Sequence, residues 1–279
     1  MLALRLAVAL GGVTALLGLF LAPQRIWPML LLASYALIGL GLAGVFFVAL
    51  QYVTGASWCV ALRRIPEAMT AALPVGGLGL AAVLLARPSL YPWVAATWEA
   101  GEGYLGFKRA WLSQPFFLAR SAVYLLIWLL FAWALVRTSR RQDSTGDIRL
   151  TRRNARLSAA FMVLFSVTFW LASYDWIMSL EPHWYSTIFG VYNFAGMFTS
   201  GLAVIAILAV WLQRAGPLRH TVNKEHLHDL GQLIVAFSTF WAYIWFSQYM
   251  LIWYANLPEE TAYFIRRIEP VWASLFVLN

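Results

Sequence analysis

Residues 230–255 read LGQLIVAFSTFWAYIWFSQYMLIWYA and contain no charged side chain. A helix needs about 20 consecutive apolar residues to cross the hydrocarbon core of a bilayer, because each residue adds about 1.5 Å to its length. The length of this stretch and its lack of charge therefore predict a membrane-spanning helix.

The rest of the chain repeats this pattern. Six further apolar runs occur at residues 2–22, 29–51, 68–86, 116–136, 157–179 and 188–212. A shorter run at 270–279 would cover roughly half a bilayer. We expect an all-α, polytopic transmembrane helix bundle with seven complete spans and a truncated eighth, which together form a single integral membrane domain over residues 1–279. The first run is longer than the apolar core of a signal peptide, so we interpret it as a true helix.

The composition excludes an ordinary soluble domain. Of the 279 residues, 62% are hydrophobic and 11% are charged, whereas an average soluble domain has about half and about a quarter. The net charge of +8 could suggest nucleic acid as a partner, but the basic residues follow the membrane topology instead. We therefore expect a lipid membrane and no nucleic acid.

The distribution of Lys and Arg predicts the orientation. The loops after the second, fourth and sixth runs hold twelve of these residues, and the other loops hold six. By the positive-inside rule the first set is cytoplasmic, and so is the amino terminus. The most basic loop, residues 137–156, is typical of a solvated linker near anionic lipid.

The outer loop at residues 87–114 mixes aromatic with charged side chains. This composition is typical of an amphipathic helix in the membrane interface, so we predict an interfacial amphipathic segment there. The segment either anchors the chain in the headgroup layer or docks a partner protein.

Ionisable side chains within spans are costly and are therefore candidates for function. Arg120 lies about one turn into the fourth run and Asp175 lies near the end of the fifth, so the two share a depth. We predict an ion pair or a hydrogen bond between them. The alternative is that Arg120 extends to the headgroups and that Asp175 only ends its helix.

More polar side chains follow Asp175 on the outer side. A carboxylate, an imidazole, a phenol and an amide at one depth suit a quinol head group, whose two hydroxyl protons need acceptors. An acidic structural turn is the alternative. The residues of this predicted quinone-binding site or outer proton path are Arg120, Asp175, Glu181, His183, Tyr192 and Asn193.

A second polar group lies on the cytoplasmic side, where it could form an inner proton path. It comprises an acid that opens the third run, a His/Asp cluster before the seventh run, and three hydroxyl side chains spaced by four residues on one helix face. The alternatives are helix-end chemistry and interhelical hydrogen bonding without transport. The residues are Glu67, His226, His228, Asp229, Thr239, Tyr243 and Ser247.

Other chemistry has few possible carriers in this sequence. The single cysteine, Cys59, cannot form an internal disulfide, a four-cysteine iron–sulfur site or a c-type haem attachment. The four histidines lie in loops or at helix ends, so haem b within the membrane is not expected. Nucleotide-binding, zinc-protease and hydrolase motifs are also missing from the sequence. We predict no metal site, no catalytic residue and no covalently bound cofactor.

Five strings in the sequence are distinctive. They are PEAMTAALPVG (66–76), QPFFLARSAVYLLIWLLFA (114–132), YDWIMSLEPHWYSTIFGVYNFAG (174–196), HLHDLGQLIVAFSTFWAYIWFSQYMLIWYANLPEET (226–261) and AYFIRR (262–267). These strings resemble the quinone-associated membrane subunits of bacterial alternative complex III, a quinol:cytochrome c (or quinol:oxidase) oxidoreductase. The likeness is nearest to the second, shorter of two paralogous subunits, which are similar to the membrane subunit of polysulfide reductase.

The resemblance implies a subunit of the bacterial inner membrane that carries no redox centre of its own and supports quinol oxidation. It implies a quinone or quinol as ligand, and as partners a paralogous membrane subunit, an iron–sulfur subunit and multihaem c-type cytochrome subunits. Proton translocation through half-channels is also implied, with the acidic and histidine positions above as carriers. Because such subunits continue for two more helices, we expect this chain to be a fragment.

Two other functions fit the same polar groups. A secondary transporter would use them for substrate or ion binding, and a purely structural anchor of a redox complex would use them only for packing. Transporters typically show paired broken helices and inverted repeats, which we do not find in the sequence.

Overall fold

The computed structural model describes residues 2–95, 103–182 and 184–268, and every regular element in these ranges is a helix. The long helices are α1 (Leu2–Leu21), α2 (Pro23–Thr54), α4 (Ala72–Ala86), α6 (Gln114–Thr145), α7 (Arg149–Trp176), α8 (Phe189–Ala215) and α9 (Lys224–Ala255). The shorter ones are α3 (Arg64–Met69), α5 (Gly103–Trp111), α10 (Pro258–Ile268) and the 3-10 helices η1 (Trp58–Ala61), η2 (Pro88–Leu90), η3 (Pro92–Val94) and η4 (Met178–Leu180). The expected all-α bundle is confirmed. The short run at 270–279 lies outside the described residues.

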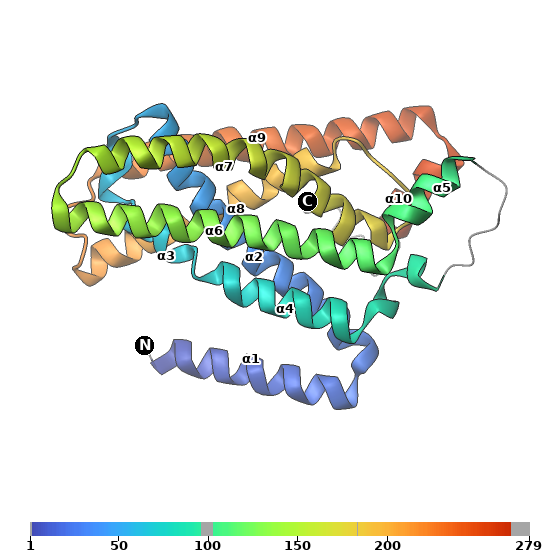
Figure 1. Cartoon of the computed structure of the whole chain (residues 1–279). Helices are drawn as coiled ribbons and strands as arrows, with labels where there is room; N and C mark the ends of the chain where they lie inside the picture. The colour runs from blue at the N-terminus through green and yellow to red at the C-terminus, as the bar shows by residue number, and fades with distance from the viewer. Residues whose placement is uncertain (1, 96–102, 183, 269–279) are drawn as a thin grey trace.

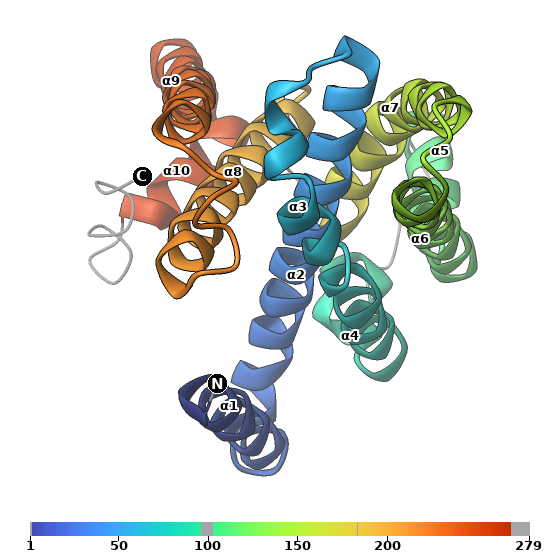
Figure 2. The same cartoon turned by 90° about the vertical axis from the view of Figure 1, so that its left-hand side faces the viewer.

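Helix α2 lies at the centre of the bundle (Figures 1 and 2). It packs against α3, α4, α7 and α8, while α6 packs against α7 and α9 against α8. Helix α1 packs against α2 and lies at the edge of the bundle in both views. One apolar cluster surrounds Trp128 and Trp176 between α6, α7 and α2, and a second surrounds Phe198 between α8, α2 and α9.

Small residues let the neighbours of α2 approach it closely. A Cβ atom added at Gly76 in α4 would lie 2.8 Å from the carbonyl oxygen of Ser34 in α2, and one added at Gly201 in α8 would collide with the Cβ atom of Ala43. Helix interfaces in membranes favour such residues, because close packing between helices replaces the hydrophobic effect there.

Six helical segments are long and apolar enough to cross a membrane. They are Pro23–Thr54, Arg64–Ala86 (α3 followed by α4), Gln114–Thr145, Arg149–Leu180, Phe189–Ala215 and Lys224–Ala255. The first expected span, residues 2–22, forms α1, but its Arg5–Leu21 part is a shorter apolar helix. Helix α1 as a whole has 20 residues, which at about 1.5 Å each matches a hydrocarbon core of about 30 Å. The described chain is thus a multi-pass helical bundle with six spans and α1.

The basic stretch at 137–156 is mostly helical, so its interpretation as a linker was wrong. Helix α6 continues to Thr145 and α7 begins at Arg149, with the left-handed Gly146 between them. Polar contacts between the two extensions hold them together, since Gln142 Nε2 donates to Thr151 Oγ1 at 2.6 Å. We call the end of the bundle with this hairpin the basic end, and the end with α5 and α10 the opposite end (Figure 1).

The segment at 87–114 has two different parts, and residues 96–102 between them lie outside the described residues. In the first part Tyr91 and Trp93 are buried. The hydroxyl of Tyr91 donates to the carbonyl oxygen of Trp176 at 3.1 Å. The second part is α5, where Phe107 is exposed. The first part is therefore anchored in the bundle by its aromatic side chains, while α5 lies at the surface, as an interfacial segment would.

Candidate functional site

Asp175, near the end of α7, is almost completely buried, with 1% of its surface exposed. Its carboxylate accepts four hydrogen bonds, about as many as a carboxylate can accept. Oδ1 accepts from Trp111 Nε1 at 3.0 Å and from Arg120 Nη2 at 2.8 Å. Oδ2 accepts from Arg120 Nε and from the Tyr124 hydroxyl, both at 3.0 Å. The predicted ion pair between Arg120 and Asp175 is confirmed.

Arg120 is held in place by more than this ion pair. Its Nη1 donates to the carbonyl oxygen of Trp111 at 2.9 Å. Its guanidinium carbon lies 4.0 Å from the ring centroid of Trp111 and 4.3 Å from that of Phe116, which are cation–π distances. Arg120 therefore points into the bundle and does not extend to the headgroups.

A cavity of about 580 Å³ lies beside this ion pair, and we call it the Asp175 cavity. Asp175 and Glu181 supply its carboxylates. The aromatic side chains of its wall are Phe107, Trp111, Tyr174, Trp184 and Tyr185. Small-molecule sites usually occupy about 300–1,000 Å³ and combine apolar walls with a few polar groups. The cavity thus suits a flat, largely apolar ring that carries hydrogen-bond donors.

Glu181 is bound by the short helix α10 at the opposite end. Arg266 Nη1 lies 2.7 Å from Glu181 Oε1 and 2.8 Å from Oε2. Tyr263 of α10 stacks on Trp184, with ring centroids 3.8 Å apart. Burial raises the pKa of the Tyr263 phenol. Helix α10 thus covers the turn that carries Glu181 and Trp184 to the cavity.

The other predicted residues of the outer group lie elsewhere. Tyr192 on α8 stacks on Trp241 of α9, with ring centroids 5.6 Å apart. The amide nitrogen of Asn193 is buried and has no hydrogen-bond partner among the described residues. Neither residue is among the described side chains that line the Asp175 cavity. His183 lies outside the described residues.

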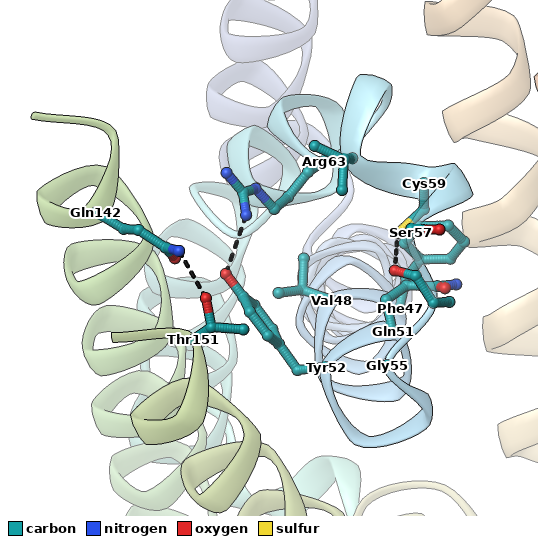
Figure 3. A pocket seen from close by; sticks show the side chains of 12 residues that line it. Phe47, Val48, Gln51, Tyr52, Gly55, Ser57, Cys59, Arg63, Gln142 and Thr151 are labelled. Atoms are coloured by element: carbon teal, nitrogen blue, oxygen red, sulfur yellow. Dashed lines mark hydrogen bonds between the residues drawn. The ribbon is translucent and has the colours of Figure 1, made fainter. Parts of the chain in front are cut away.

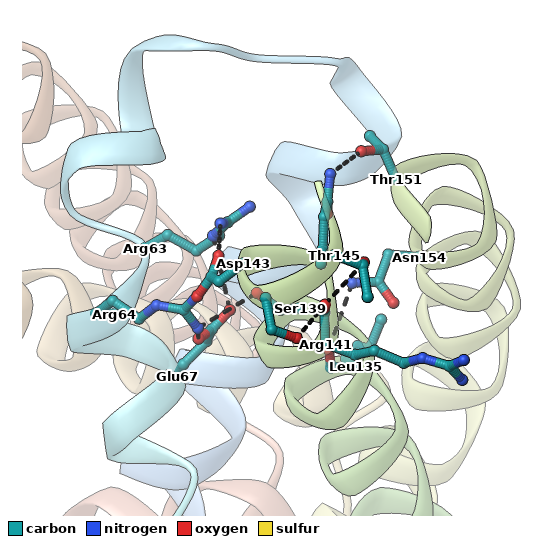
Figure 4. Close-up of polar contacts among 12 residues, drawn as sticks. Arg63, Arg64, Glu67, Leu135, Ser139, Arg141, Asp143, Thr145, Thr151 and Asn154 are labelled. Atoms are coloured by element: carbon teal, nitrogen blue, oxygen red, sulfur yellow. Dashed lines mark hydrogen bonds and ion pairs between the residues drawn. The ribbon is translucent and has the colours of Figure 1, made fainter. Parts of the chain in front are cut away.

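Glu67 belongs to a separate ionic cluster at the basic end (Figure 4). Its side chain is 2% exposed, forms an ion pair with Arg64, and lies 3.8 Å from Arg63 Nε. Both arginines also pair with Asp143 of α6. Arg64 Nη1 lies 3.4 Å from the Ser139 hydroxyl. The cluster ties α3 to the extension of α6 beyond the membrane.

A second cavity, of about 390 Å³, lies between the end of α2 and the α6–α7 hairpin (Figure 3). Tyr52 accepts a hydrogen bond from Arg63 Nη1 at 3.2 Å on one side of it, and the Gln142–Thr151 hydrogen bond lies on the other. Cys59 also lines this cavity, and burial raises the pKa of its thiol to about 11. The positive charge of Arg63 is balanced by the carboxylates beside it, so this cavity does not favour an anion.

The predicted His/Asp cluster lies at the start of α9. The backbone N–H of His226 donates to Asn223 Oδ1 at 3.0 Å, and the ring Nδ1 of His226 accepts from the backbone N–H of Asn223 at 3.2 Å. This reciprocal pair is a capping box. His228 is exposed and contacts Gln232 at 3.0 Å, and Asp229 is half-buried. The contacts of the described residues do not join this cluster to Glu67, so the two groups are separate.

The hydroxyl stripe of α9 lies mostly on the outside of the described bundle. Thr239 is exposed, Tyr243 is 67% exposed, and Ser247 is half-buried. Within the described chain the stripe therefore faces outward, and it can line a passage only together with lipid or another subunit.

Three site residues were not predicted from the sequence. Tyr124 lies one helical turn after Arg120, and this spacing could have indicated that both reach Asp175. Trp111 ends the short helix α5, and no local pattern in the sequence predicts that this helix packs against Asp175. Arg266 lies far along the chain from Glu181, and nothing in the sequence pairs them.

Comparison of the chain with protein-family models and with curated proteins finds no match.

Proposed function

We propose that the chain is an integral membrane subunit of a respiratory quinol:cytochrome c, or quinol:oxidase, oxidoreductase of the bacterial inner membrane, and that the Asp175 cavity binds the quinol head group. The observation that carries this proposal is the cavity, where two carboxylates meet aromatic walls within a membrane bundle. The strings that resemble subunits of alternative complex III support the same function.

The groups in the cavity suit the chemistry of a quinol, which loses two electrons and two protons as it becomes a quinone. The flat ring can stack on an aromatic wall such as Trp184. Each hydroxyl needs an acceptor, but the acceptor positions of Asp175 are already occupied. A quinol hydroxyl therefore binds Asp175 by displacing a donor. Trp111 is the most replaceable donor, because its N–H is neutral and comes from a short helix at the surface.

Glu181 is the proton acceptor in this proposal. Its side chain is 38% exposed, and its ion-pair partner Arg266 is 63% exposed. The two protons of the quinol can therefore leave one after the other through Glu181, which passes the first to water at the opposite end before it accepts the second. Asp175 accepts a hydrogen bond from the quinol hydroxyl and so orients it, while its carboxylate keeps the ion pair with Arg120.

The electrons leave the quinol through partner subunits, since the chain has one cysteine and too few histidines in its spans to hold haem or an iron–sulfur cluster. The proposed partners are an iron–sulfur subunit, multihaem c-type cytochrome subunits and a paralogous membrane subunit. The outward stripe of α9 would line a proton passage against the paralogous subunit, with Glu67 and the His226 cluster near its cytoplasmic end.

Replacing Glu181 with Gln in the assembled complex tests the proposal. We expect quinol oxidation to fall by about 100-fold or more, because a positioned acid–base group contributes about that much, while assembly stays normal. Glu259→Gln is the matched control, since Glu259 lies exposed on α10 outside the cavity. Unchanged quinol oxidation and proton release in both Glu181→Gln and Asp175→Asn would instead support a structural anchor.

Affinity purification from native membranes tests the partners. The proposal predicts that c-type haem and iron–sulfur signals copurify with the chain. Recovery of the chain alone would contradict the assignment to a respiratory complex.

A further inference from the structure

A third cavity, of about 610 Å³, lies on the flank of the bundle between the start of α4 and residues 129–140 of α6. Its walls include Pro74 from α4 and Leu129, Trp133 and Val136 from α6. Trp133 is 58% exposed. The cavity is therefore an open, apolar groove along a helix face that meets the acyl chains of the membrane.

Two arginines lie at the basic end of this groove. Arg137 and Arg140 both line it, one helical turn apart on α6. The Arg137 guanidinium carbon lies 4.8 Å from the ring centroid of Trp133, which places the cation beside the aromatic wall of the groove. Aromatic rings next to basic residues are typical of the membrane interface.

The charges of these two arginines are not neutralised by the described residues. The nearby acid on α6, Asp143, pairs with Arg63 and Arg64, at the start of α3. The ion pairs of the described residues do not include Arg137 or Arg140. The groove thus has two free guanidinium groups at one end and an apolar floor along the rest.

We infer that this groove binds an anionic phospholipid, whose phosphate contacts Arg137 and Arg140 and whose acyl chain lies between α4 and α6. Guanidinium groups bind phosphate oxygens at two points, and basic pockets between membrane helices bind acidic headgroups. The inference is independent of the proposed function, because the groove shares no residue with the Asp175 cavity.

Lipid binding to the full chain, purified from membranes with any subunits that stay bound, tests this inference. Native mass spectrometry compares phosphatidylglycerol with phosphatidylcholine of the same acyl chains, and with glycerol phosphate as the headgroup alone. We expect preferential retention of phosphatidylglycerol, weakened roughly 5-fold by Arg137→Gln and roughly 25-fold by the double variant with Arg140→Gln. Arg141→Gln is the matched control, because Arg141 is exposed but does not line the groove.

Three results would overturn the inference. They are equal retention of phosphatidylglycerol and phosphatidylcholine, an equal loss of phosphatidylglycerol binding in the control and in the double variant, and binding of glycerol phosphate as strong as that of phosphatidylglycerol. A photoactivatable phosphatidylglycerol added to the wild-type chain gives a test that needs no variant. We expect its label within residues 70–74 or 129–140, which line the groove, and a label confined to other segments would also overturn the inference.

Discussion

The guanidinium group of Arg120 and the carboxylate of Asp175 form a two-point ion pair between α6 and α7, with N–O distances of 2.8 and 3.0 Å. Both side chains are buried, so each charge depends on the other for its stability. Of the two residues, Asp175 lines the Asp175 cavity, and its ion pair with Arg120 fixes the position of the carboxylate there.

Loss of this ion pair should destabilise the fold. Asp175→Asn leaves Arg120 buried without its charged partner, so we expect the free energy of unfolding to fall by about 3–5 kcal/mol. Unfolding in mixed micelles with increasing denaturing detergent measures this change. Glu225→Gln, at an exposed position, should change the free energy by less than about 0.5 kcal/mol. Equal stability of the two variants would mean that the ion pair between Arg120 and Asp175 contributes little to the free energy of unfolding.

Removal of the Trp111 N–H should help quinol to bind. In Trp111→Phe the ring remains next to Arg120, but the donor that quinol must displace from Asp175 is gone. A hydrogen bond contributes about 1 kcal/mol net, so we expect the KM for quinol to fall about fivefold with little change in kcat. Steady-state kinetics of the complex measure both constants. A raised KM would show that Trp111 binds quinol and does not compete with it.

The sequence predicted most of the helices and the central ion pair, for identifiable physical reasons. Apolar runs such as 188–212 became spans because their length alone satisfies the bilayer. Arg120 and Asp175 were paired because buried charges at one depth need partners. The helical extension of α6 was missed because residues 137–156 are held by contacts with distant residues, among them the ion pairs of Asp143 with α3.

In the ionic cluster at the basic end, loss of the buried carboxylate should destabilise the fold more than loss of the exposed one. Glu67 and Asp143 bind the same two arginines, but their side chains are 2% and 50% exposed. We expect Glu67→Gln to lower the free energy of unfolding by about 3 kcal/mol and Asp143→Asn by less than about 1 kcal/mol. The same detergent titration checks this order. The reverse order would show that Asp143 holds the hairpin in place.

The single thiol should react only at high pH. Burial raises the pKa of Cys59 from 9.0 to about 11, and only the thiolate is nucleophilic. The alkylation rate of the folded chain should therefore still rise between pH 9 and pH 11 and level off only above pH 11. Because the folded state holds this proton more tightly, stability should be lost as the pH rises over the same interval. Mass spectrometry of iodoacetamide adducts follows the reaction, with the detergent-unfolded chain as the control. Rapid labelling of the folded chain at pH 7 would contradict the buried position.

The central claim is that the Asp175 cavity holds a quinol head group, and photoaffinity labelling tests it most directly. An azido-quinone is irradiated with the purified complex, and the labelled peptides are identified by mass spectrometry. We predict a label on the walls of the cavity, within residues 107–112 or 171–185, and competition by excess quinol. A label confined to other segments or to partner subunits, with none on these residues, would contradict the claim.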